Sequence, residues 1–209
     1  MTILLLVRHG VTDQTGKRLY GRSPGVHLSP RGREQAESVA ERLASVPLEA
    51  VYSSPLDRCM ETAEPTARAR RLQVRAEKGL LETDAGRWTG RTFASLYRTR
   101  AWRRFLEVPS AAQVPGGESL VGVQYRVVRA LEGLAARHPR GVVAAFSHED
   151  PIRLALAHYA GLHLDQFHRL RISPVSVSAM ALSAGVPRIL RVNDTGTLQD
   201  LVPPRTRPR

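Results

Sequence analysis

Two histidines and two arginines in this sequence are side-chain types that can hold and transfer a phosphoryl group. Arg8 and His9 are adjacent, and Arg58 and His148 each come shortly after a short apolar run. Two guanidinium groups can bind phosphoryl oxygens bidentately and stay charged at every relevant pH. A neutral imidazole can attack phosphorus and form a phosphohistidine that water then hydrolyses. With so much positive charge in one place, no metal ion is required.

The elements that precede these residues decide whether they meet. A histidine that follows a strand is more often structural than catalytic when it stands alone. The runs at 3–7, 50–52 and 142–146 are apolar throughout, which is typical of parallel strands with helices on both faces. Ligands of such sheets bind outside the carboxyl ends of the strands. We therefore expect the two histidines and two arginines to gather at one rim of a sheet.

Apolar residues at helical spacing separate the predicted strands. Ser29 and Pro30 supply an N-cap and a first-turn proline for one helix, and Asp150 is the expected N-cap of another that ends near Gly161. Further helices are expected from about 55 to 70 and 120 to 134, further strands at 72–76, 175–182 and 188–192, and a turn at 183–185. This alternation predicts an α/β fold with a mostly parallel central sheet sandwiched by helices, and an antiparallel edge strand near the C-terminus.

The length of the chain, 209 residues, suits one hydrophobic core better than two. We therefore predict a single domain over residues 1–202. Residues 86–117 show neither a helical nor a strand period and are expected to form an irregular flap or insertion. Trp88 and Trp102 lie in this segment and are expected to pack within it, with stacking on a substrate as the alternative. The segment 203–209 is rich in proline and arginine and is expected to be a basic disordered tail.

The net charge of +12 comes almost entirely from arginine, which indicates compositional bias together with an anionic ligand. Aromatic residues make up 5%, and no zinc-finger spacing is present, so nucleic-acid binding is not expected. No apolar run approaches the ~20 residues that span a bilayer, and the first residues lack a signal peptide's basic region. We expect a cytoplasmic protein. Its single cysteine, Cys59, cannot form an intramolecular disulfide and is expected to be buried in a helix.

Other phosphate chemistries and metal sites fit the sequence poorly. A tyrosine-phosphatase motif needs arginine where Pro65 follows Cys59, and a phosphate-binding Walker loop needs one residue fewer between Gly10 and Gly16. The histidines at 158, 163 and 168 are spaced by five residues. Five residues rotate about 140° around a helix, so these side chains do not share a face.

An ordered set of short motifs over about residues 3–160 resembles the histidine phosphatase superfamily, whose members include phosphoglycerate mutases. The motifs are Leu6-Val7-Arg8-His9-Gly10 with Thr12, Gly21-Arg22 leading to Leu28-Ser29, Gly32 with Gln35-Ala36, Tyr52-Ser53-Ser54-Pro55-Leu56 with Arg58 and Thr62-Ala63, Leu81-Glu82 before Gly86, Trp88 and Gly90, Pro115-Gly116-Gly117-Glu118-Ser119, and Ser147-His148. Arg-His-Gly alone is a weak motif, whereas the ordered set is specific.

The resemblance implies roles for particular residues. His9 is expected to be the phosphorylated nucleophile, with Arg8, Arg58 and His148 binding the phosphate; His148 is also expected to be a catalytic residue. Glu82 is the expected general acid for the leaving alkoxide, and Asp84 is its rival. The resemblance also implies the α/β sandwich expected from the strand and helix pattern, and it implies no cofactor.

Three positions depart from the family pattern and leave the substrate open. Thr15 stands where many members have asparagine; with Gly21, it is counted among the expected phosphate-binding residues. Tyr20 replaces a polar residue. Glu149 stands where glycine is usual, and its carboxylate would repel a polyanionic substrate or bind a cationic or hydroxyl-bearing part of one.

The sequence therefore predicts a metal-independent phosphatase that acts on small-molecule phosphate monoesters. Two alternatives stay open: a phosphoglycerate-type mutase, which usually has longer insertions than this chain, and a non-catalytic relative that binds a phosphate ligand or a protein. No nucleic-acid or membrane partner is expected, and a homodimer stays open.

Overall fold

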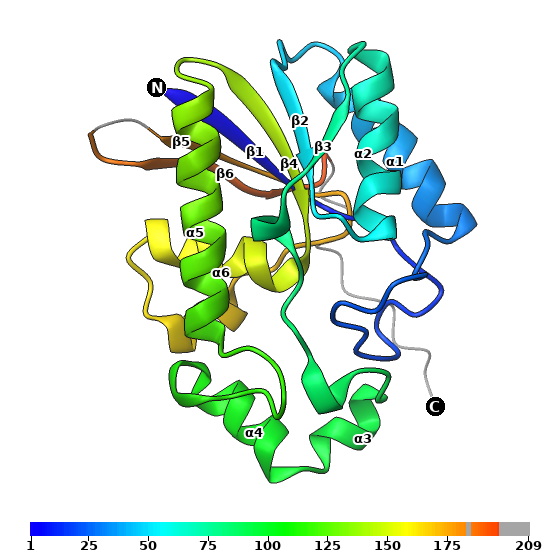
Figure 1. Cartoon of the computed structure of the whole chain (residues 1–209), viewed down its shortest axis with the longest axis vertical. Helices are drawn as coiled ribbons and strands as arrows, with labels where there is room; N and C mark the ends of the chain where they lie inside the picture. Colours follow the sequence, from blue (N-terminus) through cyan, green and yellow to red (C-terminus); the bar gives the residue numbers. More distant parts are fainter. Residues whose placement is uncertain (183–184, 197–209) are drawn as a thin grey trace, which may run out of the picture.

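A single six-stranded sheet forms the centre of the molecule in the computed structural model, which describes residues 1–182 and 185–196 (Figure 1). The strands are β1 (Thr2–Arg8), β2 (Ala50–Ser53), β3 (Val74–Ala76), β4 (Val142–Ser147), β5 (Val177–Leu182) and β6 (Arg188–Asp194), in the order β3-β2-β4-β1-β5-β6. The first four strands pair in parallel, whereas β5 is antiparallel to both β1 and β6. The predicted α/β class and the antiparallel C-terminal strands are confirmed.

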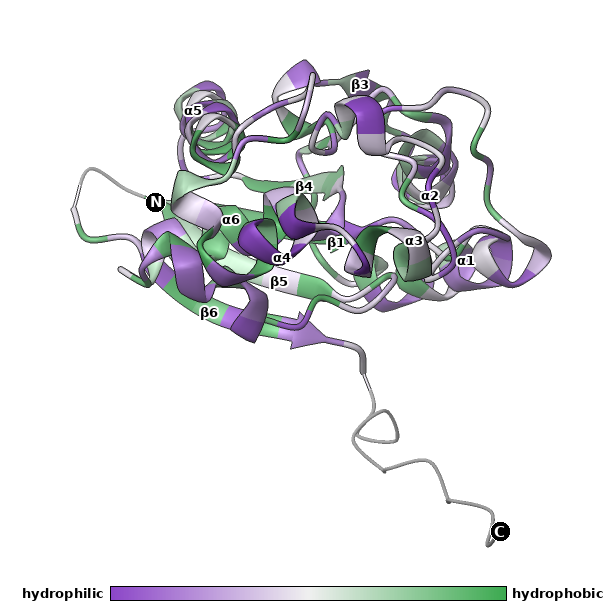
Figure 2. Ribbon diagram, turned by 90° about the horizontal axis from the view of Figure 1, so that it is seen from below, coloured by the Kyte–Doolittle hydropathy of each residue, from purple (hydrophilic) through white to green (hydrophobic). Residues whose placement is uncertain are grey.

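Helices cover both faces of the sheet, and the alternation of side chains along β1 shows why. Leu4 and Leu6 pack into a core with α5 and α6, whereas Leu5 and Val7 pack into a second core with α1 and α2. The bounds are α1 Pro30–Leu43, α2 Asp57–Ala69, α5 Leu120–Arg137 and α6 Glu149–Tyr159. In Figure 2, the central strands between these helices are mainly green, the colour of hydrophobic residues. The apolar runs in the sequence therefore reflect burial on both faces.

The segment 86–117, predicted to be irregular, contains two short helices, α3 (Phe93–Tyr97) and α4 (Arg100–Glu107), between the 3₁₀ turns Gly86–Trp88 and Pro109–Ala111. Trp88 and Trp102 are buried there in a third apolar cluster, which also contains residues of α5, α6 and the 3₁₀ helix Leu164–Arg169. The expectation that the tryptophans pack is confirmed, and the expectation of irregular structure is wrong. In Figure 1, α3 and α4 lie beyond one end of the sheet.

Further 3₁₀ structure at Lys78–Leu80 leads into the loop that carries Glu82. The predicted Ser29 N-cap and Pro30 start of α1 are observed, because the Ser29 side chain accepts a hydrogen bond from Gly32 N–H. Most of the predicted turn at 183–185 and the whole predicted tail at 203–209 lie outside the described residues. None of the helices in the described ranges is long and apolar enough to cross a membrane.

Candidate active site

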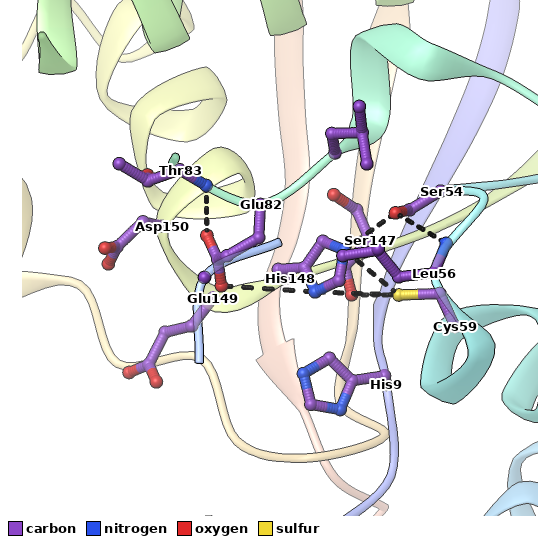
Figure 3. A network of polar contacts seen from close by, with 12 residues as sticks. His9, Ser54, Leu56, Cys59, Glu82, Thr83, Ser147, His148, Glu149 and Asp150 are labelled. Carbon is purple, nitrogen blue, oxygen red and sulfur yellow. Dashed lines mark hydrogen bonds and ion pairs between the residues drawn. The ribbon is translucent and has the colours of Figure 1, made fainter. Parts of the chain in front are cut away.

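The two histidines meet because their strands are neighbours in register. Arg8 pairs with Ser147 at the ends of β1 and β4, and His9 N–H donates to the Ser147 carbonyl at 3.0 Å. The side chains of His9 and His148 then lie edge to face, with ring centroids 5.2 Å apart (Figure 3). The predicted meeting of these residues at the carboxyl rim of the sheet is what the structure shows.

His9 is held as an uncharged ring with one nitrogen free to react. Its Nδ1 lies 2.7 Å from the Gly10 carbonyl, which can only accept, so Nδ1 carries the proton. Nε2 therefore has the lone pair, and it accepts a hydrogen bond from Arg58 Nε at 3.3 Å. Burial, followed by the charges of Arg58 and Arg8, lowers the pKa of His9 well below its usual value. The arrangement presents an imidazole lone pair, as a nucleophile needs.

Arg58 is fixed by its neighbours but keeps one donor without a partner. It lies in the first turn of α2, and its Nη2 donates to the Gly21 carbonyl at 2.8 Å. Gly21 has φ of 51°, and a Cβ there would lie 2.7 Å from the Ala85 Cβ, so glycine is required at this turn. The buried Arg58 Nη1 has no partner among the described residues. A buried donor of this kind is available to an anionic ligand.

His148 is completely buried and is oriented by two residues to which sequence reasoning gave no separate role. Its Nε2 lies 2.8 Å from Ser54 Oγ and 3.4 Å from Cys59 Sγ. Burial and then the charge of Arg58 lower the pKa of His148 well below its usual value. Ser54 directly follows β2, at the rim where the other groups lie, and that position was the available signal. Cys59 is buried in α2, as expected.

Glu82 faces His148 from the other side, with Oε2 4.0 Å from His148 Nδ1. Burial, and secondarily the charge of Asp150, raises the pKa of Glu82 to about 8, although Thr83 N–H donates to Oε1 at 2.8 Å. The carboxyl group is therefore protonated at neutral pH and can donate that proton to a leaving group. The rival Asp84 instead accepts a hydrogen bond from Gly86 N–H at 2.9 Å and does not line the cavity described below.

A clamp of two arginines around Glu118 holds the loop that presents Glu82. Arg22 Nε donates to the Glu82 carbonyl at 2.9 Å, and Arg126 donates to the carbonyls of Gly79 and Leu81, both at 2.9 Å. Glu118 Oε2 pairs with Arg22 at 2.7 Å and with Arg126 at 3.0 Å. Sequence reasoning placed Arg22 and Glu118 in family motifs without giving them a role, and Arg126 was missed.

Arg8 is more engaged than the prediction implied. Its Nη1 donates to the Ile172 carbonyl at 2.5 Å, and its Nη2 pairs with Glu149 at 2.8 Å, which leaves Nε buried and unpartnered in the described part of the chain. Glu149 also pairs with Arg153. The prediction that Asp150 caps α6 is wrong: the helix begins at Glu149, its N-cap is His148, two residues before Asp150, and the Asp150 side chain lies 3.4 Å from Arg153.

These groups open onto a cavity of about 370 Å³. All the predicted site residues except His148 line it, namely Arg8, His9, Thr15, Gly21, Arg58 and Glu82; His148 lies between Ser54 and Glu82, beside His9 (Figure 3). Tyr20 and Glu149, which depart from the family pattern, line it too. The Thr15 hydroxyl accepts from Thr12 N–H at 2.9 Å, so it stabilises the loop after the first motif.

Comparisons with known proteins agree with this geometry. The family model of the histidine phosphatase superfamily, branch 1, matches residues 4–195. Phosphoserine phosphatase 1 of Hydrogenobacter thermophilus is 32% identical over 197 residues, which cover 93% of each chain. Among solved structures, Bacillus stearothermophilus YhfR superposes with a TM-score of 0.88 at 26% identity, covering 93% of this chain and 98% of that one.

A second solved structure, mycobacterial glucosyl-3-phosphoglycerate phosphatase, superposes with a TM-score of 0.83 at 27% identity, covering 92% of this chain and 99% of that one. The family model spans nearly the whole described sheet, and the motif residues converge on one cavity. This chain therefore belongs to the histidine phosphatase superfamily and is a phosphatase of that family.

Proposed function

We propose that this chain hydrolyses small-molecule phosphate monoesters without a metal ion, and that His9 carries the transferred phosphoryl group. One observation carries the proposal: His9, whose Nε2 presents a lone pair, and the buried carboxyl group of Glu82, whose pKa is raised, line the same cavity. One supplies a lone pair and the other supplies a proton, as cleavage of an alkyl phosphate requires. The unpartnered donors Arg58 Nη1 and Arg8 Nε supply positive charge for the phosphoryl oxygens.

In the first step, His9 Nε2 attacks phosphorus and forms an N–P bond while the P–O bond to the alcohol breaks. The leaving oxygen takes the proton of Glu82, so the alcohol departs neutral and Glu82 becomes a carboxylate. Arg58, Arg8 and His148 hold the three other oxygens, on which negative charge is spread during transfer. The Gly21 carbonyl orients Arg58, and Thr15 supports the loop beside it.

In the second step, the Glu82 carboxylate accepts a proton from a water molecule, and the oxygen of that water attacks phosphorus. The N–P bond breaks, inorganic phosphate is released and both residues return to their starting protonation states. We infer that the whole of 1–202 acts as one domain in the cytoplasm. A homodimer stays a prediction.

Release of inorganic phosphate from primary alkyl phosphates in the presence of EDTA tests this proposal. We expect turnover to survive EDTA, because arginine and histidine supply the charge that a metal ion would otherwise bring. A tenfold loss that only an added divalent cation restores would contradict the metal-free mechanism. Conversion of 2-phosphoglycerate to 3-phosphoglycerate faster than phosphate release would instead identify the phosphoglycerate-type mutase.

A further inference from the structure

The cavity extends away from the phosphate-binding groups to a wall made by α3, α4 and the 3₁₀ helix Leu164–Arg169. Phe93 and Tyr97 of α3, Trp102 and Phe105 of α4, and His168 supply rings to this wall. Trp102 and Phe105 stack with centroids 5.2 Å apart and an interplanar angle of 18°. The proposed mechanism uses none of these residues, yet they border the space that the alcohol part of an ester would fill.

Two ring nitrogens in this wall are buried and have no hydrogen-bond partner within the described ranges: Trp102 Nε1 and His168 Nε2. The Trp102 side chain is 5% exposed, so solvent satisfies its N–H poorly. An indole nitrogen can only donate, and a buried donor without an acceptor is costly. Burial and the charge of Arg153 lower the pKa of His168, so its ring is uncharged near neutral pH. The Phe105 carbonyl accepts a hydrogen bond from the His168 ring, so the proton of the uncharged ring lies on Nδ1 and Nε2 is an acceptor. A ligand that brings an acceptor to Trp102 Nε1 and a donor to His168 Nε2 would satisfy both nitrogens.

The cations near this end of the cavity are already paired. Arg153 donates through Nε to the Leu170 carbonyl at 2.7 Å, and its terminal nitrogens pair with Asp150 and Glu149. Glu149 also takes one terminal nitrogen of Arg8. The remaining arginine of the cavity outside the phosphate group, Arg18, is exposed and donates to the Gly90 carbonyl. A carboxylate on the alcohol would therefore meet two acidic side chains here and, among the residues that the structure describes, no buried unpaired cation.

We propose that the site selects phosphate esters of uncharged alcohols that carry a flat apolar group and a hydrogen-bond acceptor, in preference to phosphorylated hydroxy acids. The apolar group packs against the wall that contains Phe105, the acceptor binds Trp102 Nε1, and a donor such as an amide N–H binds His168 Nε2. This inference rests on the proposed function, because it describes the alcohol end of the same cavity. It separates the substrate of this chain from the acids that appear in the names of its relatives.

Three primary alkyl phosphates test the proposal, because their leaving groups are chemically alike. They are 2-(benzoylamino)ethyl phosphate, which has a ring and an amide group that both accepts and donates, 3-phenylpropyl phosphate, which lacks the amide, and 3-phosphoglycerate, which has a carboxylate. For the unmodified chain we expect kcat/KM to be at least about tenfold higher for the amide ester than for 3-phosphoglycerate, the equivalent of roughly one buried hydrogen bond. A preference for 3-phosphoglycerate would overturn the proposal.

Trp102→Phe keeps a ring and removes the donor. We expect it to lower kcat/KM for the amide ester about 3- to 10-fold, mainly through KM, and to leave the phenylpropyl ester within about twofold. His168→Phe should produce the same selective loss, and it tests the proposal if the Trp102 variant does not fold. Trp88→Phe is the matched control: Trp88 is buried in the same cluster but does not line the cavity, so the ratio between the esters should not change.

Equal losses on the amide and phenylpropyl esters in both ring variants would show a packing role and overturn the proposal. If the unmodified chain releases phosphate from none of the three esters and forms no phosphohistidine, the proposed function itself fails, and this inference falls with it. Turnover of all three esters with no preference for the amide ester overturns the inference alone.

Discussion

Two buried histidines lie at opposite ends of β4, and their surroundings are similar in composition. His138 precedes the strand; its Nε2 lies 3.0 Å from the Tyr52 hydroxyl and its Nδ1 2.6 Å from Glu49. His148 follows the strand; its Nε2 lies 2.8 Å from the Ser54 hydroxyl and its Nδ1 4.0 Å from Glu82. Each histidine therefore has a hydroxyl group on one side and a glutamate on the other.

The difference lies in what each set leaves unpaired. Both ring nitrogens of His138 are hydrogen-bonded, and neither His138 nor Glu49 lines the cavity. Around His148, the carboxyl group is beyond hydrogen-bond distance, and buried arginine donors nearby lack partners among the described residues. A hydroxyl–histidine–carboxyl set is thus structural when both ring nitrogens of the histidine are hydrogen-bonded within the set. It is suited to chemistry when its groups are left open toward a cavity.

The largest difference in turnover should come from replacing the two glutamates, Glu82 beside His148 and Glu49 beside His138. Glu82→Gln keeps the shape and removes the proton, so hydrolysis of primary alkyl phosphates should fall by about 10²–10⁴-fold. Nitrophenyl phosphate should lose far less, because its phenolate leaves without protonation. The counterpart Glu49→Gln should retain normal turnover of both esters in the same steady-state assay. Equal losses of the two esters in the Glu82 variant would make Glu82 a binding or structural residue.

Replacement of Arg58 and of Arg75 should give the next largest difference in kcat. Arg58→Ala removes donors to a developing charge and should lower kcat by about 10²–10³-fold. Arg58→Lys should recover only part of this loss, because an ammonium group cannot reproduce the planar fork. In the set around His138, Arg75 donates to the Tyr52 hydroxyl at 3.3 Å, and Arg75→Ala should leave kcat within about twofold. Full activity of the Lys variant would remove Arg58 from the reacting centre.

The pH dependence of kcat/KM should report only groups that line the cavity, and not those around His138. The reaction needs Glu82 protonated, and burial raises the pKa of Glu82 to about 8, so kcat/KM for alkyl esters should fall about tenfold per pH unit above 8. The pKa of His9 is lowered, so the lone pair should persist well below pH 6.5 and the profile should stay flat between these limits. A pH–rate profile of the Glu82→Gln variant should lack the high-pH limb. A limb that persists unchanged belongs to another group.

Removal of the Ser54 and Tyr52 hydroxyl groups should give the smallest difference in kcat. The hydrogen bond of Ser54 occupies His148 Nε2 and fixes the ring, so Ser54→Ala should lower kcat about 3- to 10-fold, the value of one hydrogen bond. Tyr52→Phe removes the equivalent bond to His138 and should lower the free energy of unfolding by about 1 kcal/mol while kcat stays unchanged. Denaturant unfolding and steady-state assays on both variants separate the two effects. Loss of kcat in the Tyr52 variant would show that the set around His138 also takes part in catalysis.

Much of the fold and the reacting centre could be predicted because strand ends determine where residues lie. Apolar runs identify β1, β2 and β4, and their parallel register brings His9, Arg58 and His148 to one rim whatever the loops do. The ring orientation of His9 could not be predicted, because it depends on the Gly10 carbonyl and Arg58 at short range.

What could not be predicted depends on side chains that meet across long sequence separations. Arg126 of α5 donates directly to carbonyls of the Glu82 loop and also pairs with Glu118, and no local pattern marks those contacts. The helices α3 and α4 are 5 and 8 residues long, too short for a clear apolar period. Their stability comes from the aromatic cluster around Trp102, which is visible only once the chain has folded.

The residue that receives the phosphoryl group can be identified directly. Rapid mixing with a ³²P-labelled alkyl phosphate, followed by an alkaline quench and peptide mapping, should give an acid-labile label on His9. His9→Ala should abolish both the label and turnover, whereas His148→Ala, although slow, can still be labelled. His138→Phe should be labelled like the unmodified chain. Label on another residue, or substantial turnover by the His9 variant, would contradict the account.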